Sequence, residues 1–202
     1  MNDTIRRTPV TCLLIAANLV LFLLCELQGG SGSYTVMQRM GAIVTPAPFA
    51  PDLHWRLLAS MFLHFGFTHL LSNMVSLYVL GSFLEERISH IRVLLVFLFG
   101  GIGGNLISWW WYTRLGSPSV SAGASGAVSA LLGAIAALTL LGKKEMRGIS
   151  LPRLAFAVIL VVLPRSDASI DLAAHAGGLL CGFLLMALLS LLLPESGSSP
   201  RY

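Results

Sequence analysis

Apolar runs long enough to cross a lipid bilayer recur along the whole chain and constrain its fold more than any other feature. Hydrophobic residues make up 55% of the 202 residues and charged residues 11%, whereas a soluble domain carries about 25% charged residues. A bilayer span needs about 20 residues, so the chain has room for some six spans with short connections. The sequence therefore predicts an all-α membrane protein, built as a bundle of six transmembrane helices. We expect these helices at about residues 10–24, 57–84, 91–112, 122–141, 153–164 and 170–193.

The domain organisation follows from the same pattern. We expect a cytoplasmic tail at 1–9, one six-span domain at 10–193 and a polar tail at 194–202. The longest connection, 29–57, contains three prolines that should break a helix, and its apolar residues should hold it at the membrane interface. The first apolar run could instead be a cleaved signal peptide. We prefer a retained span, because every later span then acquires a consistent orientation.

The distribution of Lys and Arg predicts which side of the membrane each connection faces. An N-terminus in the cytoplasm places nine of the 13 Lys and Arg residues inside and four outside. Cytoplasmic connections carry an excess of these residues, so we expect both termini in the cytoplasm and the chain in the cell (inner) membrane. The net charge of +4 belongs to these loops. No basic stretch is interleaved with aromatic residues, so nucleic-acid binding is not expected.

The cysteines give no sign of a metal site or of a disulfide framework. Cys12, Cys25 and Cys181 each lie inside an apolar run, without the spacing of metal ligands. We expect three buried thiols and neither a metal nor another cofactor.

A serine between glycines at the start of the fourth apolar run is the candidate nucleophile. Ser125 stands in the stretch Gly123-Ala124-Ser125-Gly126. Glycines at the entrance of a helix destabilise it relative to alanine, and they are useful where another backbone approaches closely or a turn is tight. On this stretch alone a simpler interpretation is favoured, in which Ser125 is a packing residue or the N-cap of an ordinary membrane helix.

His175, near the start of the sixth run, is the candidate general base. In the expected topology the second, fourth and sixth helices all run inward from the outer side. Ser125 and His175 then lie at a shared depth, roughly 5–8 Å below the outer helix ends at 1.5 Å per residue. Small residues follow both of them along one helical face: Ser129, Gly133, Gly178 and Gly182. Close approach of these faces would bring the imidazole against the hydroxyl, as activation of a serine requires.

No convincing acidic residue completes a triad. Asp171 lies one turn before His175 on the same helix, where it could cap the helix or face the outer water. The sequence therefore predicts a Ser/His dyad.

Polar residues of the second apolar run are the candidate oxyanion donors. His69 and Asn73 are four residues apart and so share a helical face, and polar groups at this depth usually face a cavity or the bundle interior. Their N–H groups could stabilise an oxyanion. The backbone amides of Ser125 and Gly126, near a helix N-terminus, could do the same. We expect His64 to be structural or in contact with water.

At these residues the sequence resembles the rhomboid family of intramembrane serine proteases. Trp55-Arg56 and Glu85-x-Arg87 also resemble signatures of that family. The resemblance covers about residues 40–185, and three motifs on three helices are far more specific than one. These motifs stand in the family order: His69 with Asn73 for H-x-x-x-N, Gly123-Ala124-Ser125-Gly126 for G-x-S-G, and Ala174-His175 with Gly178 and Gly182 for A-H-x-x-G-x-x-x-G.

The resemblance implies a six-helix bundle in which Ser125 is the nucleophile and His175 the general base. It also implies that His69 and Asn73 help the Ser125 amide to bind the oxyanion. Ser129 departs from the family, because some members carry a tyrosine there that packs on the catalytic histidine. This departure leaves His175 less constrained, which puts the catalytic rate in doubt more than the mechanism.

We therefore expect an endopeptidase that cleaves single-span membrane proteins within or beside their transmembrane helix. Its partners are these substrates and the lipid bilayer, and its oligomeric state is open. A substrate helix must unwind locally before attack, because its amides are hydrogen-bonded within the segment. One alternative is a catalytically silent relative that binds transmembrane helices, which the intact Ser and His residues disfavour. The other is a transporter whose histidines relay protons, which the lack of an acidic residue at mid-depth disfavours.

Overall fold

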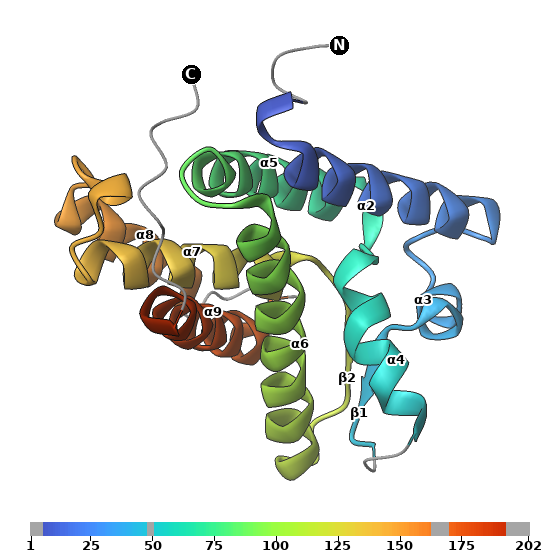
Figure 1. Cartoon of the computed structure of the whole chain (residues 1–202). Helices are drawn as coiled ribbons and strands as arrows, with labels where there is room; N and C mark the ends of the chain where they lie inside the picture. Colours follow the sequence, from blue (N-terminus) through green and yellow to red (C-terminus); the bar gives the residue numbers. More distant parts are fainter. Residues whose placement is uncertain (1–5, 48–50, 163–169, 193–202) are drawn as a thin grey trace.

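The structure is a computed structural model that describes residues 6–47, 51–162 and 170–192. Helices dominate it, and they pack into one bundle (Figure 1). The expected tail at 194–202 lies outside the described residues. The described elements, in chain order, are α2 (Pro9–Leu27), α3 (Tyr34–Met40), β1 (Ile43–Thr45), α4 (Pro51–Ala59), η1 (Ser60–Phe62), α5 (Gly66–Glu85), α6 (His90–Arg114), β2 (Ser119–Ser121), α7 (Ser125–Leu140), η2 (Lys144–Met146), α8 (Leu151–Val162) and α9 (Leu172–Leu192).

Four of the described helices are long and apolar enough to cross a membrane, namely α2, α5, α6 and α9. The helices α7 and α8 are also apolar but shorter, with 16 and 12 residues. The chain is thus an all-α, multi-pass membrane protein, as its composition predicts. The expected number of six spans depends on the two shorter helices and stays a prediction.

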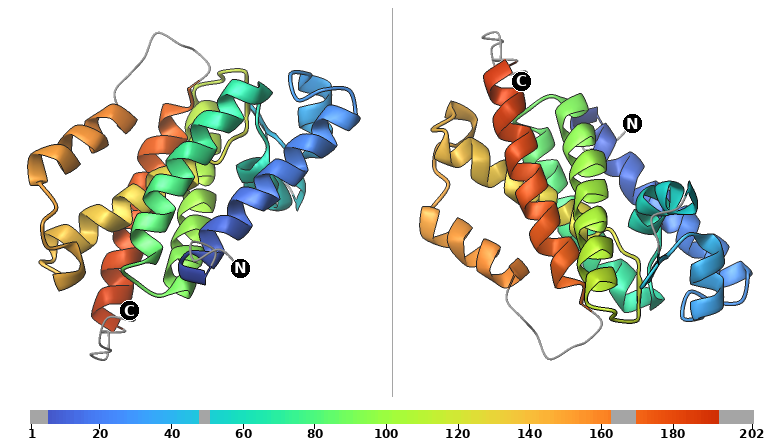
Figure 2. Two further views of the ribbon diagram at one scale, coloured as in Figure 1. Left: turned by 90° about the horizontal axis from the view of Figure 1, so that it is seen from above. Right: turned by 90° about the horizontal axis from the view of Figure 1, so that it is seen from below.

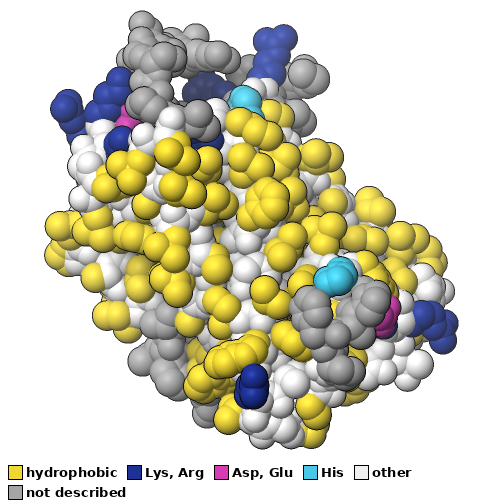
Figure 3. Space-filling model, turned by 60° about the horizontal axis from the view of Figure 1, so that its bottom comes forward, with side chains coloured by type: hydrophobic (Ala, Val, Ile, Leu, Met, Phe, Trp, Pro, Cys, Tyr) yellow, Lys and Arg dark blue, Asp and Glu magenta, His cyan; other side chains and the backbone are white. Residues whose placement is uncertain are grey.

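Large apolar side chains cover the outside of the helices. Leu13 of α2, Val79 of α5 and Leu184 of α9 are each more than half exposed. Figure 3 shows apolar side chains over most of one face of the molecule, with few charged ones among them. Soluble monomers rarely expose contiguous apolar patches above a few hundred Å². Such a surface is therefore suited to contact with lipid tails.

Hydrogen bonds at the helix ends show which ends lie together. The Glu85 carboxylate at the end of α5 accepts bonds of 2.8 Å from the amides of Val10 and Thr11, which start α2. At the opposite side, Ser31 follows α2 and accepts a bond of 3.3 Å from the amide of Gly66, which starts α5. The two helices are therefore antiparallel. We call these two sides of the bundle the Glu85 side and the Ser31 side.

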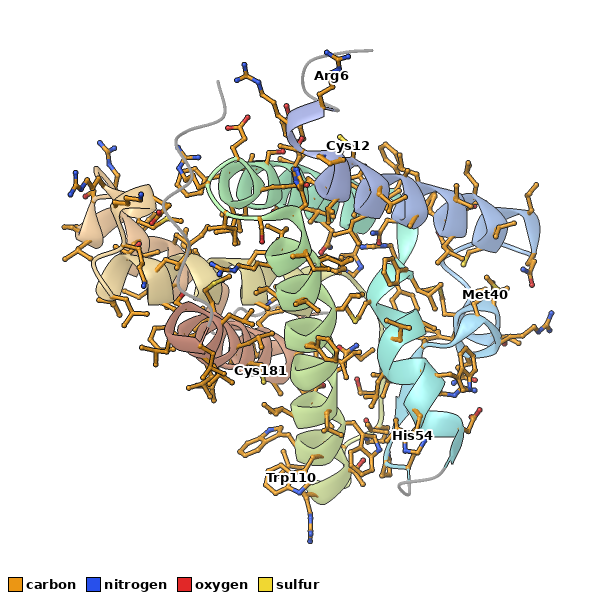
Figure 4. All side chains as sticks on the ribbon, viewed as in Figure 1. Arg6, Cys12, Met40, His54, Trp110 and Cys181 are labelled. Carbon is orange, nitrogen blue, oxygen red and sulfur yellow. The ribbon has the colours of Figure 1, made fainter. Side chains whose placement is uncertain are left out.

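The remaining helices alternate between the same two sides. His90 at the start of α6 lies 2.8 Å from the Glu85 carboxylate, so α6 leaves the Glu85 side. Figure 4 shows Trp110 near the opposite end of α6, far from Arg6 beside the start of α2. In both views of Figure 2 the end of α9 lies on the same side as the start of α2. The starts of α5 and α9 thus lie on the Ser31 side.

The helix α7 runs through the bundle with almost no exposed surface, and residues 126–138 are all buried. Small residues make this possible. A Cβ at Gly178 of α9 would lie 2.1 Å from the Gly126 oxygen, and a Cβ at Gly182 would lie 2.1 Å from the Ala130 oxygen. Glycines of α6 also lie close to both helices: a Cβ at Gly100 would lie 2.4 Å from Cβ of Ala130, and one at Gly104 would lie 2.7 Å from the Ala174 oxygen. The small-residue faces that the sequence places on the fourth and sixth helices are therefore in backbone contact.

The second span starts later than expected, and the connection before it is more ordered. Instead of an irregular loop over 29–57 and a span from residue 57, the chain forms α3, β1, α4 and η1. Pro51 stands at the first position of α4, where a missing N–H does no harm. Leu63 then has an extended backbone, so α5 begins only at Gly66. The other spans begin and end within a few residues of their expected limits, although the end expected for the fifth lies outside the described residues.

Contacts between α3 and α4 hold the connection in place. Gly41 ends α3 with a φ of 113°, and a Cβ there would lie 2.4 Å from the Trp55 ring. Arg56 donates hydrogen bonds to the carbonyl oxygens of Gln38 and Ala42, at 2.7 and 2.9 Å. The Trp55-Arg56 pair therefore serves as the contact between the two helices.

A short antiparallel strand pair joins this connection to the segment before α7. In it Ile43 lies opposite Ser121 and Thr45 opposite Ser119. The sequence analysis expected no strand here, because three residues are too few for an alternating pattern to be visible. The pair fixes the chain that leads into Ser125.

Candidate active site

Ser125 is the first residue of α7, and the turn before it is held by two hydrogen bonds that backbone amides donate. The amide of Gly123 donates to the Ser60 oxygen at 2.9 Å, and the amide of Ala124 donates to Nε2 of His64 at 3.3 Å. Gly123 has a φ of 146°, which a residue with a Cβ rarely adopts. The G-x-S-G stretch is therefore a tight turn that presents Ser125 at a helix start.

His69 lies directly over this turn. A Cβ at Gly123 would lie 3.0 Å from Cε1 and Nε2 of His69 and 3.6 Å from Oγ of Ser125. Because Gly123 has no side chain, the His69 ring and the Ser125 hydroxyl can both lie close to its backbone. Both Ser125 and His69 are half-buried.

The N-terminus of α7 is an electropositive group of amides. Its N-cap residue, Ala124, makes no side-chain capping bond, and the first amide that bonds within the helix is that of Val128, to the Ala124 oxygen at 2.8 Å. The amides of Ser125 and Gly126 precede it. Unsatisfied amides at a helix start carry the positive end of the helix dipole and favour a negative charge nearby.

The helix α9 brings His175 to the level of Ser125. A Cβ at Gly126 would lie 3.3 Å from the Ala174 oxygen. Gly126 directly follows Ser125, and Ala174 directly precedes His175. The structure thus gathers the starts of α5, α7 and α9, and with them the predicted site residues of three helices.

Asp171 acts as the N-cap of α9. Its Oδ1 accepts a bond of 2.9 Å from the amide of Ala174, and its Oδ2 accepts bonds from the hydroxyls of Ser108 at 2.5 Å and Ser121 at 2.6 Å. Of the two roles that the sequence left open, capping is the one observed. The same carboxylate ties α6 and β2 to the start of α9, and so fixes the turn that carries His175.

Asn73 is buried one turn after His69. Its side chain is only 6% exposed, and its Nδ2 donates a bond of 3.0 Å to the His69 backbone oxygen. An amide nitrogen carries two hydrogens, so one N–H is used within α5 and one is left for another acceptor.

Ser129 and His64 support the site from behind. Ser129 is buried, and its hydroxyl donates a bond of 2.7 Å to the Ser125 backbone oxygen. His64 is fully buried, and its ring lies 5.2 Å from that of His69, edge to face. Because Nε2 of His64 accepts the Ala124 amide, His64 is a structural residue here, one of the two roles expected for it.

Sequence analysis missed Asn105. It lies in α6 and is 5% exposed, and its Nδ2 donates to the Leu57 oxygen at 2.8 Å and to Oγ of Ser60 at 2.9 Å. Because the Ser60 oxygen accepts the Gly123 amide, Asn105 supports the turn before Ser125 through η1. A polar residue within an apolar span is a recognisable signal of a functional or structural contact. The glycines around Asn105 indicate close helix packing, which is a separate signal.

The described residues contain no group of three or more His, Cys, Asp or Glu side chains that could hold a metal ion. Within 6–47, 51–162 and 170–192, the polar groups around Ser125 are imidazoles, amides and hydroxyls, together with the Asp171 carboxylate that caps α9. Such a set fits nucleophilic chemistry with hydrogen-bond stabilisation of charge.

Comparison with known proteins agrees with this chemistry. The family model of the rhomboid domain matches residues 51–192. The chain is 33% identical over 186 residues to the putative rhomboid protease YdcA of Bacillus subtilis, covering 90% of this chain and 88% of that protein. It is 34% identical over 189 residues to the rhomboid protease GluP of the same organism, covering 93% of this chain but 36% of that one.

A plant protein matches a shorter part. RHOMBOID-like protein 5 of Arabidopsis thaliana is 38% identical over 155 residues, which cover 73% of this chain and 48% of that protein. The chain thus spans about a third to a half of GluP and of this plant relative, and nearly all of YdcA. A domain match over most of the chain, together with relatives above 30% identity over most of it, shows that the chain belongs to the rhomboid family.

Proposed function

We propose that this protein is an intramembrane serine endopeptidase that cleaves membrane proteins within or beside a membrane-spanning helix. One observation carries the proposal, the environment of Ser125. Its hydroxyl lies at an uncapped helix start, next to the His69 ring over Gly123, where the backbone of α9 touches Gly126. The names of the relatives as rhomboid proteases support the same activity.

In this mechanism Ser125 and His175 act as a dyad. His175 takes the proton of the Ser125 hydroxyl as Oγ attacks the carbonyl carbon of the scissile peptide bond. The same imidazolium then gives the proton to the leaving amine, which frees the C-terminal part of the substrate. Water, deprotonated by His175, hydrolyses the acyl-enzyme and restores Ser125. Asp171 positions α9 and takes no proton.

The negative oxygen of the tetrahedral intermediate would be held by the start of α7. The backbone amides of Ser125 and Gly126 are the nearest donors, and His69 and Asn73 add side-chain N–H groups from α5. Removing one donor of such a set usually lowers kcat by about 10²–10³. Neither a metal nor a cofactor takes part in this scheme.

For the arrangement in the membrane we propose six spans within a protease domain at residues 10–193, with α7 and α8 as the two short ones. A short span is tolerable for α7, because residues 126–138 are shielded from lipid by other helices. The excess of Lys and Arg on the Glu85 side supports an orientation with that side and both termini in the cytoplasm. The membrane proposed is the inner membrane of the cell. The catalytic groups then open toward the outer side.

The proposed substrates are single-span membrane proteins. Their transmembrane helix must unwind at the cleavage site, because a helical amide has its carbonyl hydrogen-bonded within the segment. We expect small residues at the cleavage site and helix-breaking residues close after it.

A serine-reactive fluorophosphonate probe, combined with cleavage of a model single-span substrate, tests the proposal. Wild-type protein should be labelled and should cleave, and Ser125→Ala should do neither. Thr139→Ala is the matched control, since it removes a hydroxyl that bonds to the Ile135 oxygen of the same helix, far from Ser125, and it should keep the label. A helix-binding protein without activity, or a proton-relaying transporter, would show no labelling that depends on Ser125.

A further inference from the structure

A cavity of about 250 Å³ opens on the Glu85 side of the bundle, away from Ser125. It is large compared with the roughly 10–15 Å³ that one water needs. Three parts of the chain meet around it: the turn between α5 and α6, the end of α7 with the loop that follows, and the end of α9. Its lining residues are Ile88, Arg92, Leu138, Gly142, Lys143, Lys144, Glu145 and Ser190.

A buried hydroxyl in this cavity lacks a partner. Ser190 of α9 is 4% exposed, and its Oγ makes no hydrogen bond to any residue in the described part of the chain. A buried hydroxyl without a partner destabilises the folded protein. The hydroxyl and the cationic side chains line one cavity, so a single ligand with oxygen acceptors could bond to both.

The charge of the lining favours an anion. Three of its side chains are cationic and one, Glu145, is anionic, which leaves a net charge of +2. The cavity also lies at the start of α6, where the helix dipole is positive and no side chain caps the helix.

Three carbonyl oxygens at the end of α7 are hydrogen-bonded within the chain. The oxygens of Ala137, Leu138 and Thr139 accept bonds of 2.9–3.0 Å from the amides of the next turn. Gly142 makes this possible with a φ of 66°, the left-handed conformation that closes a helix C-terminus. These three acceptors are therefore already used, and the cationic side chains of the lining carry the attraction for an anion.

We propose that this cavity binds a phosphate group, with Lys143 and the Ser190 hydroxyl among its donors. The headgroup of an anionic phospholipid and a soluble phosphate share this chemistry. Ile88 and Leu138 add apolar contacts beside the charged ones, as the headgroup and first carbons of a lipid would require. In the orientation proposed above, the cavity faces the cytoplasmic leaflet, whose anionic lipids attract basic pockets between helices.

Thermal melting of the purified full chain in detergent tests this proposal without depending on orientation or on proteolysis. Phosphatidylglycerol is added in mixed micelles, with phosphatidylcholine as the neutral arm and inorganic phosphate, at matched ionic strength, as the soluble arm. A ligand that binds only the folded state raises the melting temperature as its concentration increases. We expect a saturable rise with phosphatidylglycerol and none with phosphatidylcholine.

Two pairs of variants locate the effect. Lys143→Gln should weaken the apparent affinity about tenfold, the loss expected for one charge-assisted hydrogen bond. Arg147→Gln, which removes the same charge from the same loop outside the cavity, should not. Ser190→Ala should weaken binding without lowering the melting temperature of the ligand-free protein. Its control is Ser82→Ala, since Oγ of Ser82 is also buried and unpartnered among the described residues but lies outside the cavity.

The arms also separate the two sources of phosphate. A rise with phosphatidylglycerol alone, dependent on Lys143 and Ser190, identifies a lipid headgroup site. If inorganic phosphate raises the melting temperature as much as phosphatidylglycerol does, and this rise also depends on Lys143 and Ser190, the cavity is a site for a soluble phosphate. Equal shifts in all variants, or an equal shift with phosphatidylcholine, would overturn the proposal.

Discussion

The backbone amide of Ala124 donates a hydrogen bond of 3.3 Å to Nε2 of His64. This bond crosses between two segments sixty residues apart, and it ends on the residue immediately before Ser125. The His64 ring also lies edge to face against that of His69. One buried imidazole thus touches both the turn that carries the proposed nucleophile and a proposed oxyanion donor.

We predict that His64→Ala lowers both stability and turnover. A buried amide of Ala124 without its acceptor costs about 1–3 kcal/mol, and the loosened turn should lower kcat more than it changes KM. His64→Gln keeps an acceptor within reach and should recover part of both losses. Melting temperature and kcat measured on the same preparations check this. If turnover were normal in a destabilised His64→Ala protein, His64 would have no role in positioning Ser125.

The second prediction follows from the backbone contact between α7 and α9. A Cβ at Gly178 would lie 2.1 Å from the Gly126 oxygen, so the two helices cannot accept it without moving apart. Gly178→Ala should therefore cost about 1–3 kcal/mol or more in stability, as overpacking does, and should separate Ser125 from His175. The control is Gly32→Ala, because a Cβ at Gly32 meets nothing within 4 Å. Equal melting temperatures for the two variants would contradict this account.

A third prediction concerns Asp171. In a Ser-His-Asp triad, loss of the acid through Asp→Asn lowers kcat about 10⁴-fold. Because Asp171 bonds to Ser108, Ser121 and the Ala174 amide, we expect a different result. Asp171→Asn should lower the melting temperature, and its loss of kcat should stay far below that of a triad acid. The helix cap itself survives this change, because Asn caps a helix about as well as Asp, so the loss of stability comes from the two hydroxyl bonds to Oδ2. A 10⁴-fold loss in a protein of normal stability would make Asp171 a member of the catalytic set.

These residues show how much of the molecule its sequence predicts. The spans follow from apolar runs, and the contact of α7 with α9 follows from small residues at helical spacing, since both signals are local. The start of α5 could not be predicted, because the apolar residues from 57 onward suit a bent chain as well as a straight helix. The strand pair, the Asp171 network and the Asn105 bonds each join segments far apart in the chain. The type of a single residue does not indicate which distant segment it contacts.

The last prediction is that Asn73 acts on the transition state. Its Nδ2 already donates to the His69 oxygen at 3.0 Å, so one structural role is plain. That bond lies within α5, where the helix supplies other support for the same carbonyl, and the second N–H is the one that could reach an oxyanion. Asn73→Ala should then lower kcat by about 10²–10³ with little change in melting temperature.

Asn73→Asp gives the matched control, because it keeps the size of the side chain and replaces the donor with an acceptor. It should be at least as inactive as Asn73→Ala, since a carboxylate would repel the developing negative charge. Measuring kcat and melting temperature on both purified variants decides between the two roles. A large loss of stability with nearly normal turnover would show that Asn73 only holds the His69 turn in place.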